Sequence, residues 1–344
     1  MKKKSNRRQF LKDGLALSGA MALFPLPENK KRKPKMTHLE PKSNSYPSYL
    51  NLWETGELDR RAEELYTHYS SCSLCPRDCR VDRTRGEKGK CQASDSLKIS
   101  SAFPHFGEED PLVGKKGSGT IFFSHCGLRC VYCQNYSISF EAGGVEVPEE
   151  RAAESMLKLQ GMGCHNINLV TPTHYLPGIV RALKIAASRG LKIPIVYNTG
   201  GYEKPETLRL LDGIVDIYLP DFKYTDPACS SAYSSEAYSY PYYVKEAFRE
   251  MFRQVGNLET DRYRTARRGL MIRHLVLPNN VAGTREMLKF VAEELSTDCY
   301  LNIMRQYRPE YRAREYPKID RRIKPSEYAQ AVNEAKKMGF TNLA

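Results

Sequence analysis

Two groups of closely spaced cysteines constrain this chain more than any other feature of its sequence. The groups are Cys72-x2-Cys75-x3-Cys79-x11-Cys91 and Cys126-x3-Cys130-x2-Cys133. Four thiolates within twenty residues form a complete ligand set for a metal, whereas three thiolates leave one coordination position open. An exogenous ligand can bind at an open position. The second group therefore predicts a reactive metal centre, and the first predicts a closed one.

The sequence around the second group predicts where it lies in a fold. An apolar run over 119–124 leads directly into Cys126 and reads as a strand. Five further strand-like runs lie at 166–170, 192–197, 214–219, 271–277 and 300–304, and helical patterns lie at 148–162, 176–188, 204–211, 243–255, 285–295 and 326–337. This alternation predicts six βα units with parallel strands. The C-terminal ends of such strands carry the chemistry in parallel barrels, and the second cysteine group falls there.

The distribution of charge argues against a nucleic-acid partner. Residues 1–36 hold eleven Lys or Arg and two acidic residues, a net charge of +9. The other residues hold 42 basic and 38 acidic side chains, a net charge of only +4. Because the charge outside the first 36 residues is nearly balanced, we expect no nucleic-acid groove. Apart from one run near the N-terminus the chain has no long apolar stretch, so we also expect no membrane span.

The N-terminal segment has the pattern of an export signal. Arg7 and Arg8 are followed by Phe10 and Leu11 and then by a mildly apolar, Gly- and Ala-rich run to Leu26. Residues 1–26 resemble a twin-arginine signal, a route that carries folded proteins and suits a cargo loaded with its metal beforehand. A disordered basic tail is the alternative. Residues 27–48 are rich in Lys, Pro and Ser and are predicted to be a linker.

The second cysteine group and its companions resemble a known superfamily. The stretch from Gly117 to Asn135, with Tyr132 before the third cysteine, resembles the radical SAM superfamily, and in particular the pyruvate formate-lyase activating enzyme-like group. Further stretches that resemble this group are 101–109, 166–177, 272–278 and 304–307, so the resemblance covers roughly residues 70–340. It implies an open partial (β/α)6 barrel of the TIM type over 116–344, preceded by a cysteine-rich region over 49–115.

The resemblance also implies a chemistry. The thiolates of Cys126, Cys130 and Cys133 would bind a [4Fe-4S] cluster, and S-adenosylmethionine (SAM) would chelate the fourth iron. One electron from a flavodoxin- or ferredoxin-type donor would cleave SAM to a 5′-deoxyadenosyl radical, which abstracts hydrogen from a substrate. A glycyl radical enzyme is one candidate substrate, and another protein or a small molecule is the alternative. SAM and a low-potential donor are expected in the cytoplasm, whereas the leader indicates the periplasm, so the location stays open.

Candidate SAM-binding residues follow the predicted strands. The resemblance implies cofactor-binding roles for Tyr132, His174, Asn198, Asp221, Lys223 and Arg273. Lys223 could pair with the carboxylate of SAM as a point charge. The Gly-Gly-Glu segment that many superfamily members carry after the second strand is absent, which leaves the contact to the SAM amino group to Thr171, Thr173 or His174.

Two alternatives concern the metals. The group Cys72, Cys75, Cys79 and Cys91 could hold structural zinc or a second [4Fe-4S] cluster, or form disulfides. Its spacing, with one x2 pair and one x3 pair, departs from the two x2 pairs of zinc ribbons. At the second group the rival is a zinc site with His125 or His165 as fourth ligand, in a non-catalytic iron–sulfur or zinc protein.

Overall fold

A computed structural model describes residues 47–344, so the predicted signal over 1–26 and nearly all of the predicted linker over 27–48 lie outside the described residues. The strands are β1 (Lys98–His105), β2 (Ser118–Phe123), β3 (Val145–Glu146), β4 (Ile167–Val170), β5 (Ile195–Thr199), β6 (Ile217–Pro220), β7 (Glu259–Thr260), β8 (Ala266–Leu275) and β9 (Tyr300–Met304). The α-helices are α2 (Tyr49–Glu54), α3 (Glu57–Thr67), α4 (Asp110–Val113), α5 (Tyr136–Ser139), α6 (Glu149–Gly161), α7 (Leu176–Ser188), α8 (Pro205–Arg209), α9 (Pro227–Tyr233), α10 (Tyr240–Val255), α11 (Thr284–Glu294) and α12 (Pro325–Lys337). No helix in this part of the chain is long and apolar enough to cross a membrane.

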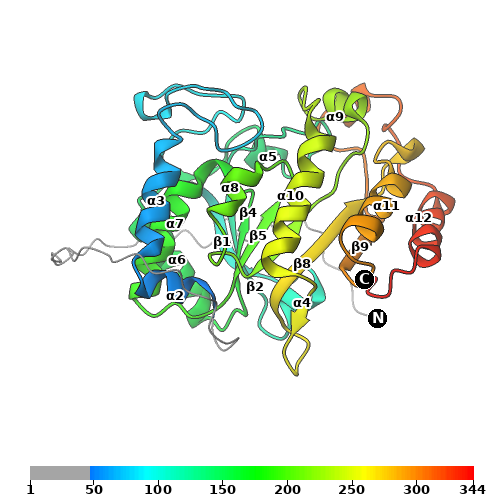
Figure 1. The fold of residues 1–344 in the computed structure, drawn as a ribbon. Coiled ribbons are helices and arrows are strands. Elements are labelled where there is room, and N and C mark those ends of the chain that lie inside the picture. The colour runs from blue at the N-terminus through cyan, green and yellow to red at the C-terminus, as the bar shows by residue number, and fades with distance from the viewer. Residues whose placement is uncertain (1–46) are drawn as a thin grey trace.

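The strands form one open, curved sheet with helices on its outer side (Figure 1). Strands β2, β4, β5, β6, β8 and β9 are adjacent and parallel in that order. The predicted partial barrel with six parallel strands is therefore confirmed, and the sheet does not close. An isolated parallel bridge between Asp221 and Arg273 extends the β6–β8 pair toward the C-terminal ends of the strands.

Three antiparallel strands were not predicted. Strand β1 pairs with β2 on one side and with β3 on the other, and β7 forms a hairpin with the start of β8. In β1 most positions are only partly buried, so the sequence lacks the apolar alternation that marks a strand. The hairpin makes β8 begin at Ala266, five residues before the predicted strand, because its first half pairs with an edge strand.

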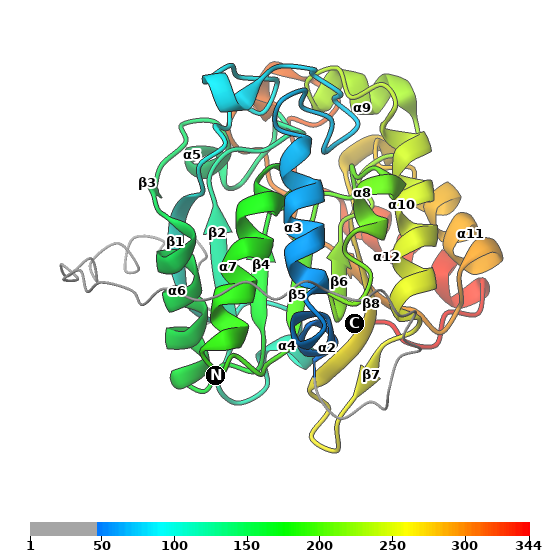
Figure 2. The same ribbon diagram turned by 60° about the vertical axis from the view of Figure 1, so that its left-hand side comes forward.

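The N-terminal helices cover the outside of the sheet. Leu58, Ala62 and Leu65 recur at helical spacing on α3 and are buried, and α3 packs against α7 (Figure 2). Residues 68–97 follow α3 and contain little regular structure beyond a short turn of 3-10 helix at Arg83–Arg85. This segment runs over the end of the sheet that also carries α5, at the top of Figure 1. It thereby brings the first cysteine group to the same end of the sheet as the second.

Candidate functional site

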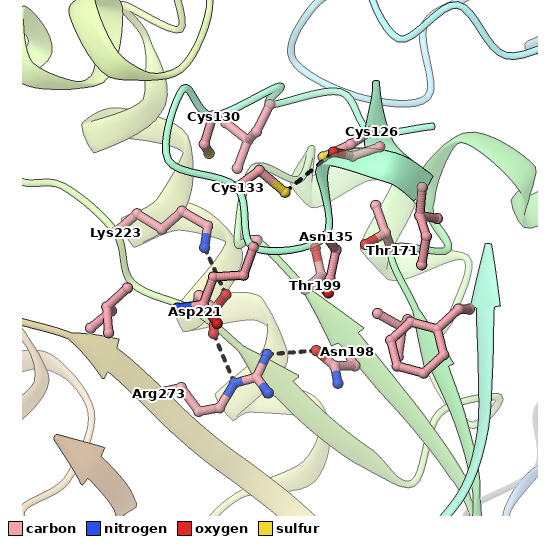
Figure 3. A pocket seen from close by; sticks show the side chains of 18 of the residues that line it. Cys126, Cys130, Cys133, Asn135, Thr171, Asn198, Thr199, Asp221, Lys223 and Arg273 are labelled. Atoms are coloured by element: carbon pink, nitrogen blue, oxygen red, sulfur yellow. Dashed lines mark hydrogen bonds and ion pairs between the residues drawn. The ribbon is translucent and has the colours of Figure 1, made fainter. Parts of the chain in front are cut away.

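The loop after β2 carries the three cysteines of the second group into a cavity of about 200 Å³. Cys126, Cys130 and Cys133 all line this cavity, and Figure 3 shows them along one loop. The hydroxyl of Ser234 donates a hydrogen bond to the sulfur of Cys130 at 3.0 Å, and the hydroxyl of Ser139 lies 3.2 Å from the sulfur of Cys133. Such contacts stabilise thiolates that ligate iron.

Burial and charge act in opposite directions on these thiols. Burial raises the pKa of the Cys130 thiol, and the nearby ammonium of Lys223 and the Ser234 hydrogen bond oppose that rise. Burial likewise raises the pKa of Cys133 to about 12. A buried thiol with so high a pKa becomes a thiolate only when a cation takes the place of its proton. The donor set therefore fits a metal centre.

Charged residues from neighbouring strands form the opposite wall of the cavity (Figure 3). Asp221, just after β6, accepts from the Lys223 Nζ at 2.7 Å and from the Arg273 Nε at 2.8 Å. Arg273, on β8, also donates to the Oδ1 of Asn198 at 2.6 Å and lies 3.4 Å from a carboxylate oxygen of Glu108. Burial would raise the pKa of Asp221, but the charges of Arg273 and Lys223 outweigh it and hold that pKa below its usual range. Asp221 is thus ionised between two cations.

Five of the six residues predicted to bind SAM line this one cavity: Tyr132, Asn198, Asp221, Lys223 and Arg273. Tyr132 is buried edge-on against Tyr224 and Tyr307, at centroid distances of 6.4 and 5.8 Å. The lining also contains Glu108, Thr171 and Gln306, of which the sequence had singled out only Thr171 for cofactor binding. Their positions follow from the fold, because Glu108 comes after β1 and Gln306 comes after β9.

His174 lies outside that cavity. Its Nε2 is 2.8 Å from the carbonyl oxygen of Ser124, and the side chain is 4% exposed. Burial lowers the pKa of His174 to about 3, so the ring is neutral. The ring borders two smaller hollows that the first cysteine group also lines. A role for His174 in binding SAM stays a prediction, while Thr171 lines the cavity itself.

The two histidines considered as a fourth zinc ligand are far from equivalent. His125 lines the cavity beside Cys126, and burial lowers its pKa to about 4. His165 instead accepts hydrogen bonds from the backbone amides of Lys115 and Lys116, before β2. No three Cys, His, Asp or Glu side chains within residues 47–344 are arranged to enclose a single metal ion. His125 is therefore the one of these two histidines that lies beside the three thiols.

A buried carboxylate that the sequence did not single out lies between the two cysteine groups. Glu203 is 1% exposed and lines a hollow that also contains Cys75 and Cys126. It accepts hydrogen bonds from the hydroxyls of Thr199, Thr173 and Tyr197, the last two at 2.7 and 3.3 Å. Burial raises the pKa of Glu203 to about 7, although these hydrogen bonds oppose the rise. The signal in the sequence is slight, a Gly-Gly-Tyr-Glu run directly after β5.

The raised pKa of Glu203 predicts a pH dependence of stability. Between its ordinary value of 4.5 and about 7, the folded chain holds a proton that the unfolded chain has released. The free energy of unfolding should therefore fall as pH rises through this window, by up to about 3 kcal/mol from this group. Denaturant unfolding should show that, from about pH 5 to about pH 8, the free energy of unfolding of Glu203→Gln falls less than that of wild type, by about that amount. Glu206→Gln, at an exposed carboxylate on α8, is the matched control, and a Glu203→Gln profile parallel to wild type would contradict this expectation.

Comparison with known proteins places the cavity in a wider context. The family model described as the radical SAM superfamily matches residues 120–247. An uncharacterised protein of Methanocaldococcus jannaschii is 33% identical over 289 residues, which are 81% of this chain and 78% of that protein. The crystal structure of a radical SAM methyltransferase from Sphaerobacter thermophilus aligns with a TM-score of 0.43 and 15% identity. That alignment covers 65% of this chain and 65% of the methyltransferase chain, slightly less than two thirds of its length.

Proposed function

The chain belongs to the radical SAM superfamily, and from that premise we propose that its cavity binds a [4Fe-4S] cluster and SAM and that the protein is a SAM-cleaving enzyme. Cys126, Cys130 and Cys133 would hold the cluster, since all three line the cavity and the thiols of Cys130 and Cys133 need a cation to ionise. The observation that carries the proposal is that these thiols and five residues predicted from sequence to bind SAM line one cavity.

When bound, a reduced cluster would supply the electron for cleavage of the SAM carbon–sulfur bond, and the 5′-deoxyadenosyl fragment would take a hydrogen atom from a substrate. The chain's own residues position the reagent. Lys223 presents an ammonium beside Cys130, where it can pair with a carboxylate of the bound reagent. The Asp221 carboxylate holds the Lys223 ammonium in place through a hydrogen bond of 2.7 Å. The Arg273 Nε donates to the other oxygen of Asp221 at 2.8 Å and so fixes the carboxylate.

The test of this proposal is formation of 5′-deoxyadenosine. The full chain is reconstituted anaerobically with iron and sulfide, reduced with dithionite, and mixed with SAM, and the products are followed by mass spectrometry. We expect 5′-deoxyadenosine and methionine in equal amounts. A protein that carries the cluster but forms neither product would be a non-catalytic iron–sulfur protein, and the proposal would fail. Cys229→Ala, which removes a cysteine outside both groups, should match wild type.

Lys223 gives a sharper prediction about binding. Lys223→Met keeps the length of the side chain and removes its charge, and Asp221 still has Arg273 as a partner. Loss of a charge-assisted contact of about 2 kcal/mol should raise the dissociation constant of SAM about 30-fold. Calorimetric titration of the anaerobic protein measures this constant. Lys184→Met, at an exposed ion pair with Asp59, is the control, and equal affinities in the two variants would contradict the role given to Lys223.

The substrate and the electron donor are proposed from the resemblance in sequence. A glycyl radical enzyme is the first substrate to test, with another protein or a small molecule as the alternative, and the donor would be of the flavodoxin or ferredoxin type. Mixing the reduced protein and SAM with a candidate glycyl radical enzyme should produce an organic radical signal in electron paramagnetic resonance spectra. A candidate that remains silent while 5′-deoxyadenosine accumulates is not the substrate.

Export remains a proposal on the leader sequence alone. If residues 1–26 act as a twin-arginine signal, an Arg7→Lys, Arg8→Lys variant should be retained in the cytoplasm while wild type reaches the periplasm. Cell fractionation separates the two cases. Identical distribution of variant and wild type in the cytoplasm would show that the leader is not a working signal.

A further inference from the structure

The four cysteines of the first group meet around one small hollow although their segment has little regular structure. Cys72, Cys75, Cys79 and Cys91 all line it. The segment is held by backbone pairing, since the amide of Cys72 donates to the carbonyl of Val81 at 2.9 Å. Burial raises the pKa values of the Cys75 and Cys91 thiols, and neighbouring thiols add to the rise. Four thiols therefore share one small hollow.

Local backbone features point at one of these sulfur atoms. The amide of Lys90 donates to the sulfur of Cys79 at 3.3 Å. A Cβ at Gly89 would lie 2.8 Å from that sulfur, so the approach of this backbone requires glycine. Amide hydrogen bonds to ligand sulfurs are a recurring feature of metal–thiolate sites, because they stabilise the negative charge.

A buried cation supplies an independent observation. Arg83 is 1% exposed and lines the same hollow. Its guanidinium donates to the carbonyls of His174, at 2.7 Å, and Ser94, and it stacks over the ring of Tyr69 at 4.2 Å. It pairs with no carboxylate in the described part of the chain, and its Nε has no hydrogen-bond partner there. A buried charge of this kind needs an anion, and the titratable groups that face it are the Tyr69 hydroxyl and the thiols of Cys91 and Cys72.

We propose that Cys72, Cys75, Cys79 and Cys91 hold a second [4Fe-4S] cluster as thiolates and that Arg83 compensates its negative charge. The four cysteines line one common hollow. Their spacing, with one x2 pair and one x3 pair, differs from that of zinc ribbons and favours a cluster over zinc.

The proposed cluster would lie directly beside the three-thiol site. The sulfur of Cys75 is 3.8 Å from where a Cβ on Gly127 would lie, and Gly127 follows Cys126. Arg77, between two cysteines of the first group, donates to the carbonyls of Gly127 at 2.8 Å and Leu128 at 3.4 Å. One hollow is lined by Cys75, Cys91 and Cys126 together. Two reduced clusters in this arrangement should therefore show magnetic coupling.

The test counts metals in the full chain. In a variant with Cys126, Cys130 and Cys133 all changed to alanine, the anaerobically prepared protein should retain about four iron and four sulfide per chain. A variant with the four cysteines of the first group changed to alanine should retain a similar amount, at the other site. The variant lacking all seven should retain none, and Cys229→Ala should match wild type, which carries twice the iron of either partial variant.

Two results of the same metal analysis would overturn the proposal of a second cluster. One zinc per chain without iron in the three-alanine variant would overturn the proposal in favour of a structural zinc site. Neither metal, with the four thiols oxidised in pairs, would overturn it in favour of disulfides. SAM cleavage is measured separately, in protein that keeps Cys126, Cys130 and Cys133, so this proposal can fail without failure of the proposed function.

Spectroscopy supplies a second readout. The doubly reduced wild type should give a broadened electron paramagnetic resonance spectrum that is not the sum of the spectra of the two partial variants. In the three-alanine variant, Arg83→Gln should shift the midpoint potential of the remaining cluster to lower values, because a positive charge favours the reduced form. Arg83→Lys keeps the positive charge and should therefore bring the midpoint potential most of the way back to that of the variant with Arg83. A sum of independent spectra, or an unchanged potential in Arg83→Gln, would contradict the proposed location.

Discussion

Cys130→Ala should lose SAM cleavage by at least about 1,000-fold, equivalent to about 4 kcal/mol of barrier. Cys130 is buried, accepts a hydrogen bond from the hydroxyl of Ser234 and interacts with the ammonium of Lys223. With two thiols left, the site no longer holds a cluster with one open position. The rate of 5′-deoxyadenosine formation in the reduced, reconstituted protein measures the effect.

A buried cysteine outside both groups provides the control for that loss. Cys164→Ala removes a thiol that is 3% exposed, compared with 8% for Cys130, and it should leave the rate within about 2-fold of wild type. Far-ultraviolet circular dichroism shows whether both variants are folded. A folded Cys130→Ala protein that keeps more than about a tenth of the wild-type rate would contradict the assignment of this cysteine.

Asp221→Asn should reduce the free energy of unfolding by about 3 kcal/mol, because it leaves two cations without their shared anion. Lys223 and Arg273 are 18% and 12% exposed, and each directs a nitrogen at Asp221 within 2.8 Å. The amide that replaces the carboxylate can accept a hydrogen bond but carries no charge. We also expect weaker SAM binding, since the ammonium of Lys223 loses the contact that fixes it. Denaturant unfolding and calorimetric titration measure the two effects.

A surface carboxylate provides the matched substitution. Asp59 pairs with Lys184, but the two side chains are 55% and 44% exposed, so Asp59→Asn should cost no more than about 1 kcal/mol. Equal destabilisation by the two substitutions would mean that the Asp221 cluster is only a solvated ion pair. That result would contradict the electrostatic account of the cavity wall.

The part of the cavity whose arrangement could be predicted from sequence is the part fixed by parallel topology. Asn198, Asp221 and Arg273 lie on or directly after strands β5, β6 and β8, which are neighbours in the sheet. The C-terminal ends of neighbouring parallel strands meet, so polar residues there converge whatever the loops do. The same argument correctly placed the cysteine loop, because it directly follows β2.

The residues that sequence did not place depend on how loops turn. His174 comes soon after β4, as expected, but Thr171 adopts a positive φ of 57° and the following turn directs the His174 ring toward the carbonyl of Ser124. Glu203 was missed because a carboxylate two residues after a glycine pair normally reads as exposed. The hydroxyls that donate to it come from two segments, Tyr197 and Thr199 on β5 and Thr173 after β4, and no local pattern reveals that they meet.

The proximity of the two cysteine groups could not be predicted from the sequence either. Residues 68–97 have almost no regular structure, so no periodicity indicates which face of the sheet they cover. Their position depends on tertiary contacts such as those of Arg77 with the loop that follows Cys126. The spacing alone therefore predicted two sites without predicting that they adjoin.

The most direct test of the central claim asks whether SAM is a ligand of the cluster at the three-thiol site. The reduced protein is mixed with SAM labelled by magnetic isotopes at its carboxylate oxygen and its amino nitrogen, and electron–nuclear double resonance spectra are recorded. The account predicts hyperfine coupling of both labels to the cluster, and the loss of that coupling in Cys130→Ala. A reduced cluster that shows no coupling to either label, or zinc in place of iron at Cys126, Cys130 and Cys133, would contradict it.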